Sequence, residues 1–261
     1  DPWSNLYYTK DFNQLSFAKN KNKKLEKNVL KKADCVLTVS NSLKEEFKKY
    51  SNNVKVITNG FDDEVLVKEK NYLDIKFSIS YIGLLPKQSH SDLFFKVLAS
   101  ICKNNSDFRK NIKLNFIGDI CAETKEAIEK YNLNEYTSFY GYLSHKEAIL
   151  HQQNSQVLLL LIPNILENKG ILTGKVFEYI AAKRPILGIG PKDGDLSNIL
   201  KETKSGVILD FNDEEGLKEE IQRLYNLYKE KKLNLNPVNI QQFHRKKLTE
   251  QLANIIKNTC K

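Results

Sequence analysis

The chain has 261 residues, which is enough for one large domain or two small ones. Hydrophobic residues make up 41% of it and charged residues 28%, a composition that fits a globular protein and excludes a collagen, a disulfide scaffold and a wholly disordered chain. The longest uninterrupted apolar run, residues 157–163, is far shorter than the roughly 20 residues that cross a bilayer. The first residues lack the basic and apolar regions of a signal peptide.

The net charge of +9 is concentrated in two segments. Residues 19–49 carry ten lysines against four acidic residues, and residues 239–261 carry five basic residues against one acidic residue. Residues 50–238 are balanced, with 25 basic and 25 acidic side chains. The charge is therefore a property of two segments near the ends of the chain, not of the whole surface.

The cysteine and methionine content bears on metal binding, on the redox compartment and on whether the chain is part of a longer protein. The four cysteines lie far apart, with no CxxC pair and no nearby histidine at ligand spacing, so we expect no structural zinc. Sparse thiols in apolar surroundings, such as Cys35, favour a reducing, cytoplasmic compartment. The chain has no methionine, so we expect that it is processed or is a piece of a longer protein.

The first 57 residues predict few elements. A helix ends near Ala33, a short strand covers residues 35–39, a helix capped at residues 40–42 runs to Tyr50, and a second short strand covers residues 54–57. So few elements cannot enclose a core of their own. We therefore expect residues 1–57 to be the remnant of another, N-terminal domain, joined by a linker near residues 58–64.

From residue 76 onward, apolar strands alternate with helical patterns. The strands are predicted at residues 77–82, 112–117, 137–140, 156–162, 185–189 and 206–209, and all six read as buried. The helices are predicted near residues 89–103, 121–131, 144–154, 173–183, 194–202 and 213–231. Strict alternation implies right-handed βαβ crossovers. The fold class is therefore α/β, a Rossmann-like parallel sheet with helices on both faces, over residues 58–238.

The final segment, residues 239–261, predicts one more helix after the break at Pro237. Its apolar residues fall on one helical stripe: Ile240, Phe243, Leu248, Leu252, Ile255 and Ile256. We expect this helix to cross back to the N-terminal domain.

Chemistry in a parallel sheet is expected in the loops beyond the carboxyl ends of the strands. Gly83, Gly118 and Gly141 each follow a predicted strand. Glycine there either completes a tight turn or lets the backbone approach a ligand, and the sequence leaves both readings open.

The most informative loop runs from Gly170 to Gly174 and leads straight into a helix. Backbone N–H groups at such a start can hold an anion. Lys175 in the first turn is unfavourable unless an anion balances it, which suggests a phosphate. Glu178 lies on the same helix face and could accept hydrogen bonds from sugar hydroxyls, although a plain surface Lys–Glu pair is the alternative. The spacing matches neither a Walker A loop nor a dinucleotide-binding glycine motif.

Taken in order, several segments resemble the group 1 (family 4) glycosyltransferases. These segments are residues 33–40, 56–62, 81–83, 116–119, 139–145 and 174–180, the last followed by residues 183–187. The resemblance covers nearly the whole chain. It implies the GT-B architecture of two facing Rossmann-like domains, of which this chain is the C-terminal, donor-binding half.

The resemblance also implies roles for particular residues in binding a nucleotide sugar. Glu178 matches the second glutamate of the family's Glu-x7-Glu motif, which binds the donor ribose, whereas Gly170 replaces the first glutamate. The remaining expected contacts are Leu172, Thr173, Gly174 and Lys175 at the diphosphate, Gly83 and Lys87 after the first strand of the domain, and Tyr142 and His145 beside the base.

By the same resemblance, the reaction is a retaining transfer from a UDP- or GDP-linked sugar without metal or other cofactor, with positive groups and helix amides stabilising the leaving diphosphate. The acceptor is expected to be a glycan or a lipid-linked molecule in surface glycan or polysaccharide synthesis. The acceptor-side catalytic groups would lie in the N-terminal domain, so this chain alone is expected to be inactive. Both basic segments would associate with that domain. Peripheral contact with an anionic membrane at its inner face is then a further expectation.

Two alternatives stay open from the sequence. The lysines of residues 19–32 could neutralise nucleic-acid phosphates, but interleaved aromatics and a groove-reading motif are lacking, so we expect no nucleic-acid partner. A GT-B relative with other chemistry, such as a nucleotide-sugar epimerase, is the second alternative.

Overall fold

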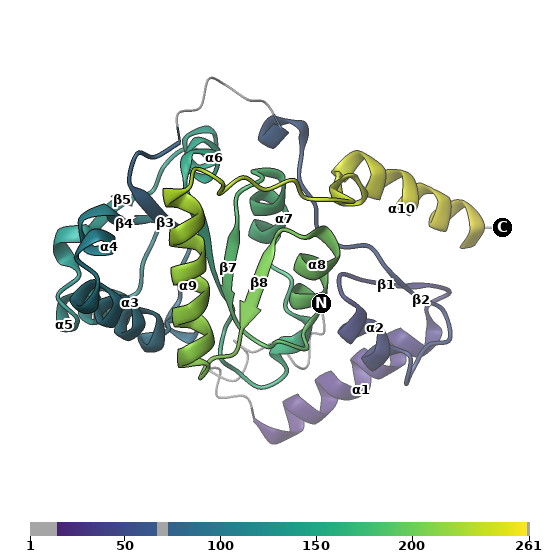
Figure 1. Ribbon diagram of the computed structural model, residues 1–261. Helices are drawn as coiled ribbons and strands as arrows, with labels where there is room; N and C mark the ends of the chain where they lie inside the picture. Colours follow the sequence, from purple (N-terminus) through teal and green to yellow (C-terminus); the bar gives the residue numbers. More distant parts are fainter. Residues whose placement is uncertain (1–14, 67–72, 260–261) are drawn as a thin grey trace.

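The computed structural model describes residues 15–66 and 73–259 (Figure 1). They form a small N-terminal unit, a six-stranded sheet domain and a C-terminal helix. The first 14 residues of the predicted N-terminal remnant, and Cys260 with the last residue, lie outside the described part of the chain.

The N-terminal unit has the predicted order of elements. It consists of α1 (Ser16–Lys32), β1 (Val36–Thr38), α2 (Asn41–Phe47) and β2 (Val54–Val56), and β1 pairs with β2 in parallel. Its buried apolar side chains form one small cluster of Leu30, Val36, Phe47 and Val54. The assignment of residues 1–57 to a second domain stays a prediction.

The sheet domain confirms the predicted α/β fold. Its strands are β3 (Phe77–Ile82), β4 (Ile112–Ile117), β5 (Thr137–Gly141), β6 (Val157–Leu161), β7 (Ile186–Ile189) and β8 (Gly206–Leu209). All are parallel, in the order β5-β4-β3-β6-β7-β8. The order reverses between β3 and β6, which is where ligands bind in open sheets of this kind.

Helices cover both faces of this sheet. One face packs against α3 (Asp92–Asn104), α4 (Ser106–Asn111), α5 (Ala122–Lys130) and α9 (Glu214–Lys229). The other packs against α6 (His145–Asn154), α7 (Gly174–Ala181) and α8 (Asp195–Thr203). Successive side chains of a strand point to opposite faces. In β3, for example, Ile79 and Tyr81 join the first core, whereas Ile82 joins the second.

Two details of the sheet domain differ from the sequence prediction. Residues 137–140 were expected to form a buried strand, but β5 (Thr137–Gly141) is an edge strand whose last three residues are exposed, because it has a neighbour on one side only. The short helix α4 was not predicted. It is a single six-residue helix begun by the Asn105 side chain, which accepts a hydrogen bond from the Phe108 N–H at 2.9 Å.

The C-terminal stripe is divided between two elements. Ile240 and Phe243 belong to a short 3-10 turn, η6 (Ile240–Phe243), and are buried with Phe177 in the second core of the sheet domain. The helix α10 (Arg245–Thr259) begins only afterwards, with Leu248 as its buried residue. The predicted helix from residue 239 is therefore wrong in its first turns. None of the helices among residues 15–66 and 73–259 is long and apolar enough to cross a membrane.

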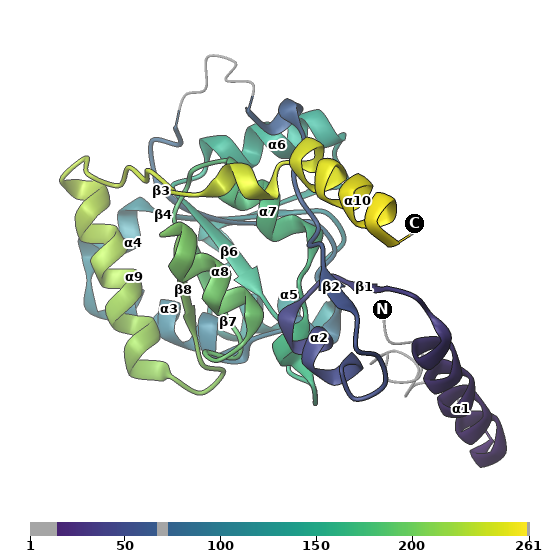
Figure 2. The ribbon, with the colours of Figure 1, turned by 90° about the vertical axis from the view of Figure 1, so that its right-hand side faces the viewer.

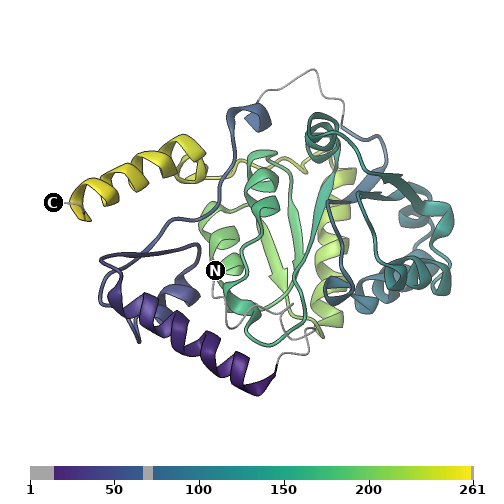
Figure 3. The ribbon, with the colours of Figure 1, turned by 180° about the vertical axis from the view of Figure 1, so that it is seen from behind.

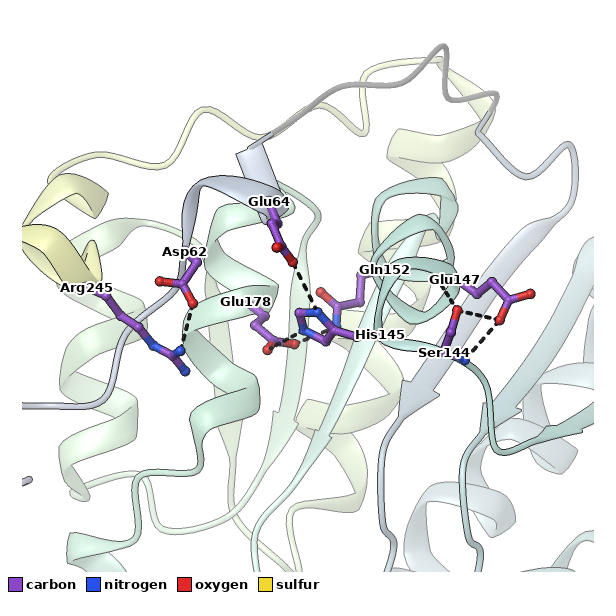
Figure 4. A network of polar contacts seen from close by, with 8 residues as sticks. All are labelled: Asp62, Glu64, Ser144, His145, Glu147, Gln152, Glu178 and Arg245. Carbon is purple, nitrogen blue, oxygen red and sulfur yellow. Dashed lines mark hydrogen bonds and ion pairs between the residues drawn. The ribbon is translucent and has the colours of Figure 1, made fainter.

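The linker and the start of α10 lie side by side. The Phe61 N–H donates to the Phe243 carbonyl at 3.1 Å, and the Arg245 N–H donates to the Phe61 carbonyl at 3.0 Å. Asp62 also pairs with Arg245 at 2.7 Å (Figure 4). The linker at residues 61–62 and the chain that leads into α10 at residues 243–245 are thus bonded to each other.

The N-terminal unit docks beside the loop that precedes α7. The Ser42 N–H at the start of α2 donates to Asp195 Oδ2 of α8 at 2.8 Å. A Cβ added to Gly170 would lie 3.1 Å from both Ser40 Oγ and Ser42 Cβ, which is tight. Glycine at position 170 therefore fits this close packing.

Candidate functional site

Gly83 and Gly118 follow β3 and β4 and have φ angles of +113° and +109°, a region that side chains rarely adopt. A Cβ added to Gly118 would lie 2.6 Å from the Gly83 carbonyl oxygen, so turn geometry alone requires glycine at position 118. At Gly83 the atoms that a Cβ would meet are Cε and Nζ of Lys175, at 3.0 and 3.2 Å. Gly83 therefore makes room for a side chain from another element.

Lys175 extends from the first turn of α7 across to β3. Its Nζ donates a hydrogen bond to Tyr81 Oη at 2.7 Å and lies 3.9 Å from the centroid of the Tyr81 ring. The Tyr81 hydroxyl donates in turn to the Leu84 carbonyl at 2.7 Å. The predicted residues Gly83 and Lys175 thus meet at the carboxyl end of β3.

Burial lowers the pKa of Lys175 from its usual 10.5 to about 7, and the Glu178 carboxylate opposes this only in part. Among the described residues, no carboxylate lies within 4.0 Å of its Nζ. The expected alternative of a surface Lys175–Glu178 pair is therefore wrong, because the two side chains bond to different elements.

The start of α7 leaves polar groups available. The Thr173 hydroxyl is buried and has no hydrogen-bond partner in the described structure. A Cβ added to Gly174 would meet nothing within 4 Å, so the first residue of α7 borders open space. Leu172 is buried in the second core, so its side chain is structural and only its backbone could contact a ligand.

Glu178 is held by two side chains from α6 (Figure 4). Gln152 Nε2 donates to its Oε2 at 2.9 Å, and His145 Nε2 lies 3.3 Å from its Oε1. The other ring nitrogen of His145 lies 3.6 Å from Glu64 Oε2 in the linker turn. His145 thus links the linker to the carboxylate that is expected to bind the ribose.

Two predicted site residues stand apart from this group. Lys87 points to α5, where its Nζ lies 2.8 Å from Glu123 Oε1, and its side chain is 74% exposed. That carboxylate raises the pKa of Lys87. Tyr142 is almost fully exposed in the loop before α6. The structure therefore places Lys175 against Gly83 and His145 against Glu178, with Thr173 and Gly174 at the start of the same helix, whereas Lys87 pairs with Glu123 and Tyr142 is exposed.

Sequence reasoning missed Tyr81, Gln152 and Glu64. Tyr81 was noted only as part of the segment 81–83, and its side chain lies in the core on the α3 side of β3. Gln152 is a buried polar residue near the end of α6, and the local sequence carries no signal of that burial. No group of three or more His, Cys, Asp or Glu residues in the described part of the chain could hold a metal ion.

Comparisons with known proteins agree with this fold. The family profile described as glycosyl transferases group 1 matches residues 62–237. Among solved structures, the Anabaena protein HepE in complex with UDP has a TM-score of 0.70 at 14% identity, covering 91% of this chain and 68% of its own. Sucrose-phosphate synthase from Thermosynechococcus elongatus has a TM-score of 0.70 at 15% identity, covering 98% and 66%.

The pneumococcal O-GlcNAc transferase GtfA in complex with UDP and GlcNAc has a TM-score of 0.66 at 15% identity and is covered to 48%. Comparison with curated proteins gives no match. The chain thus spans from about two thirds to about half of these structures. Its fold is that of the C-terminal half of a GT-B glycosyltransferase. The chain belongs to the group 1 glycosyltransferase family.

Proposed function

We propose that this chain forms the donor site of an enzyme that moves a sugar from a UDP- or GDP-linked donor to a glycan or lipid-linked acceptor in surface glycan or polysaccharide synthesis. The observation that carries the proposal is the arrangement at α7. Lys175 lies over Gly83, and Glu178 lies one turn further along the same helix. In this pose the diphosphate contacts Lys175 and the N–H groups at Gly174, while the ribose hydroxyls donate to Glu178.

The chemistry follows from these groups. Breaking the sugar–phosphate bond leaves negative charge on the diphosphate, and a cation and helix N–H groups placed at that point stabilise it. We propose a retaining transfer that uses no metal and no other cofactor, with the charge on the leaving group stabilised by the protein alone. The acceptor-side groups belong to the N-terminal domain in this proposal.

The experiment is calorimetric titration of UDP and GDP into the protein and into Glu178→Ala. A hydrogen bond to a charged group contributes about 1.5–3 kcal/mol, so we expect the Kd of the bound nucleotide to rise roughly tenfold to a hundredfold. Glu126→Ala, an exposed carboxylate on α5, is the matched control and should leave the Kd unchanged. If neither nucleotide binds, or if both variants behave alike, the donor-site assignment is wrong.

We further propose that the basic N-terminal unit touches an anionic membrane surface. Leu25 and Val29 are exposed on α1, beside the lysines of residues 19–32. Exposed apolar residues flanked by lysines suit the boundary of an anionic bilayer.

A further inference from the structure

Lys175 is an unusual lysine within this chain. Several lysines of the sheet domain have carboxylate partners, such as Lys96 with Glu214 at 2.6 Å and Lys130 with Asp92 at 3.1 Å. Lys175 instead has the Tyr81 hydroxyl and ring as neighbours. Its Cε lies against Gly83, where a side chain on that residue would crowd it. Its amine therefore has no carboxylate of the described chain in contact with it to hold its proton, and Glu178 acts on it only from a distance.

The groups that face this amine come from two elements. Tyr81 on β3 supplies a phenol oxygen that accepts from Nζ, and burial raises the pKa of that phenol, so it stays neutral. On α7 itself, Glu178 is the carboxylate that raises the pKa of Lys175, and its two oxygens already contact His145 and Gln152. Tyr179 is buried, and its hydroxyl accepts from the Ile82 N–H at 2.9 Å. The Cys121 thiol at the start of α5 acts on the Tyr81 phenol, whose pKa it helps to raise.

We propose that Lys175 is a switchable cation: above neutral pH its amine is largely deprotonated in the free protein, and it takes up a proton from solvent when the donor diphosphate binds. This rests on the proposed function, because it needs a diphosphate at α7. The nitrogen lone pair forms the new N–H bond, and the proton comes from the buffer acid. Tyr81 acts as a positioning residue that holds Nζ over Gly83 in both states.

The direction of the pH dependence follows from this proton. The pKa of Lys175 in the free protein is about 7, and a bound dianionic diphosphate raises it. At about pH 8 most of the free protein carries the neutral amine, so binding takes up close to one proton. Near pH 6 the amine is already protonated and uptake disappears. Between the pKa of Lys175 in the free protein and its pKa in the complex, the affinity for the donor falls by up to about tenfold for each unit by which the pH rises.

The test is calorimetry at pH 8 in two buffers with different ionisation enthalpies, with UDP-glucose and GDP-mannose as the probes. Both phosphates of a nucleotide sugar are diesters that do not titrate near neutral pH, so a proton taken up belongs to the protein. We expect close to one proton per bound donor at pH 8 and none near pH 6. Lys175→Arg, which stays charged, should bind with no uptake. The surface variant Lys125→Gln should behave as the unaltered protein does.

The Tyr81→Phe variant tests the positioning role. Removing the oxygen that accepts from Nζ disfavours the ammonium, so the midpoint of proton uptake should move to lower pH and the Kd at pH 8 should rise about threefold to tenfold. A merely structural role would change thermal stability without moving that midpoint.

The outcomes separate this inference from the proposed function. If a donor binds with no net proton uptake at pH 8, or if Lys175→Arg takes up the same proton, Lys175 is not the switch, but the donor site stands. If neither donor binds at either pH, the proposed function fails and this inference fails with it.

Discussion

Lys175 and Glu178 lie one turn apart on α7, yet each is held by a different partner element. Lys175 reaches β3 through Tyr81, whereas Glu178 is bonded to Gln152 and His145 of α6. The i,i+3 spacing predicted a shared helix face, and that face exists. It does not produce a pair, because the sheet and α6 offer each side chain a closer partner. The lysine amine and the carboxylate are thus held by different elements.

Gly83 and Gly174 make a matched pair for testing backbone roles. Alanine at position 83 needs a φ of +113° and brings its Cβ to 3.0 Å from Lys175 Cε, so we expect Gly83→Ala to lower the free energy of unfolding by about 1–3 kcal/mol. Gly174 is helical and open, so Gly174→Ala should change it by less than about 1 kcal/mol, toward higher stability. Urea unfolding measures both. Equal effects would mean that the Lys175–Gly83 contact does not constrain the loop.

At the scale of the elements, the sequence predicted most of the fold because burial and periodicity determine it. Strands such as β6 are apolar throughout and bury every residue, so their runs are unmistakable. β5 and α4 show where this signal weakens, because an edge strand and a single-turn helix bury few side chains. The start of α10 was misplaced because Ile240 and Phe243 continue the helical stripe in sequence but pack against Phe177 in space.

Only those parts of the site that lie close together in the sequence could be predicted. The loop from Gly170 to Gly174 carries a local signal, because a helix start after glycine suits an anion whatever lies around it. Tyr81 and Gln152 act through contacts 94 and 26 residues away. Such partners depend on the register of β3 and on the facing of α6, and no local spacing encodes them.

The docking of the N-terminal unit depends on one buried carboxylate. Asp195 is 7% exposed, and its Oδ2 accepts from the Ser42 N–H at the start of α2. We expect Asp195→Ala to cost about 1–2 kcal/mol locally, because a buried helix N–H loses its acceptor. Hydrogen exchange should then quicken in α2 and β2 while β3 and β6 stay protected. Asp195→Asn keeps an acceptor oxygen, so its exchange rates in α2 and β2 should lie between those of the unaltered protein and those of Asp195→Ala. Unchanged exchange in α2 would show that other contacts hold the unit.

For the whole molecule, the two basic segments share one side. Both α1 and α10 project from the side of the sheet away from α3, α4 and α5 (Figures 1 and 3). Figure 2 looks onto that side, with α2, β1 and β2 between the two helices. The expectation that both segments serve one surface would have failed had they pointed to opposite ends. The excess positive charge therefore lies on one side of the molecule, whereas the basic and acidic residues of the sheet domain balance each other.

A directed charge of this kind predicts selective vesicle binding. We expect the protein to sediment with vesicles containing phosphatidylglycerol but not with pure phosphatidylcholine, and to be released as salt rises from 0.05 to 0.3 M, at about the ionic strengths where screening becomes strong. Replacing Lys21, Lys24, Lys31 and Lys32 of α1 by glutamine should reduce binding at least tenfold, since each lysine near such a surface contributes about 1 kcal/mol.

The matched control replaces four exposed lysines of the sheet domain by glutamine: Lys103, Lys125, Lys201 and Lys218. Both variants then have the same net charge, so net charge alone predicts equal losses, whereas a directed surface predicts a loss only for the α1 variant. Equal losses, or binding to neutral vesicles, would contradict the membrane contact. Tighter, salt-sensitive binding to random oligonucleotides than to anionic vesicles would assign the α1 lysines to nucleic acid instead.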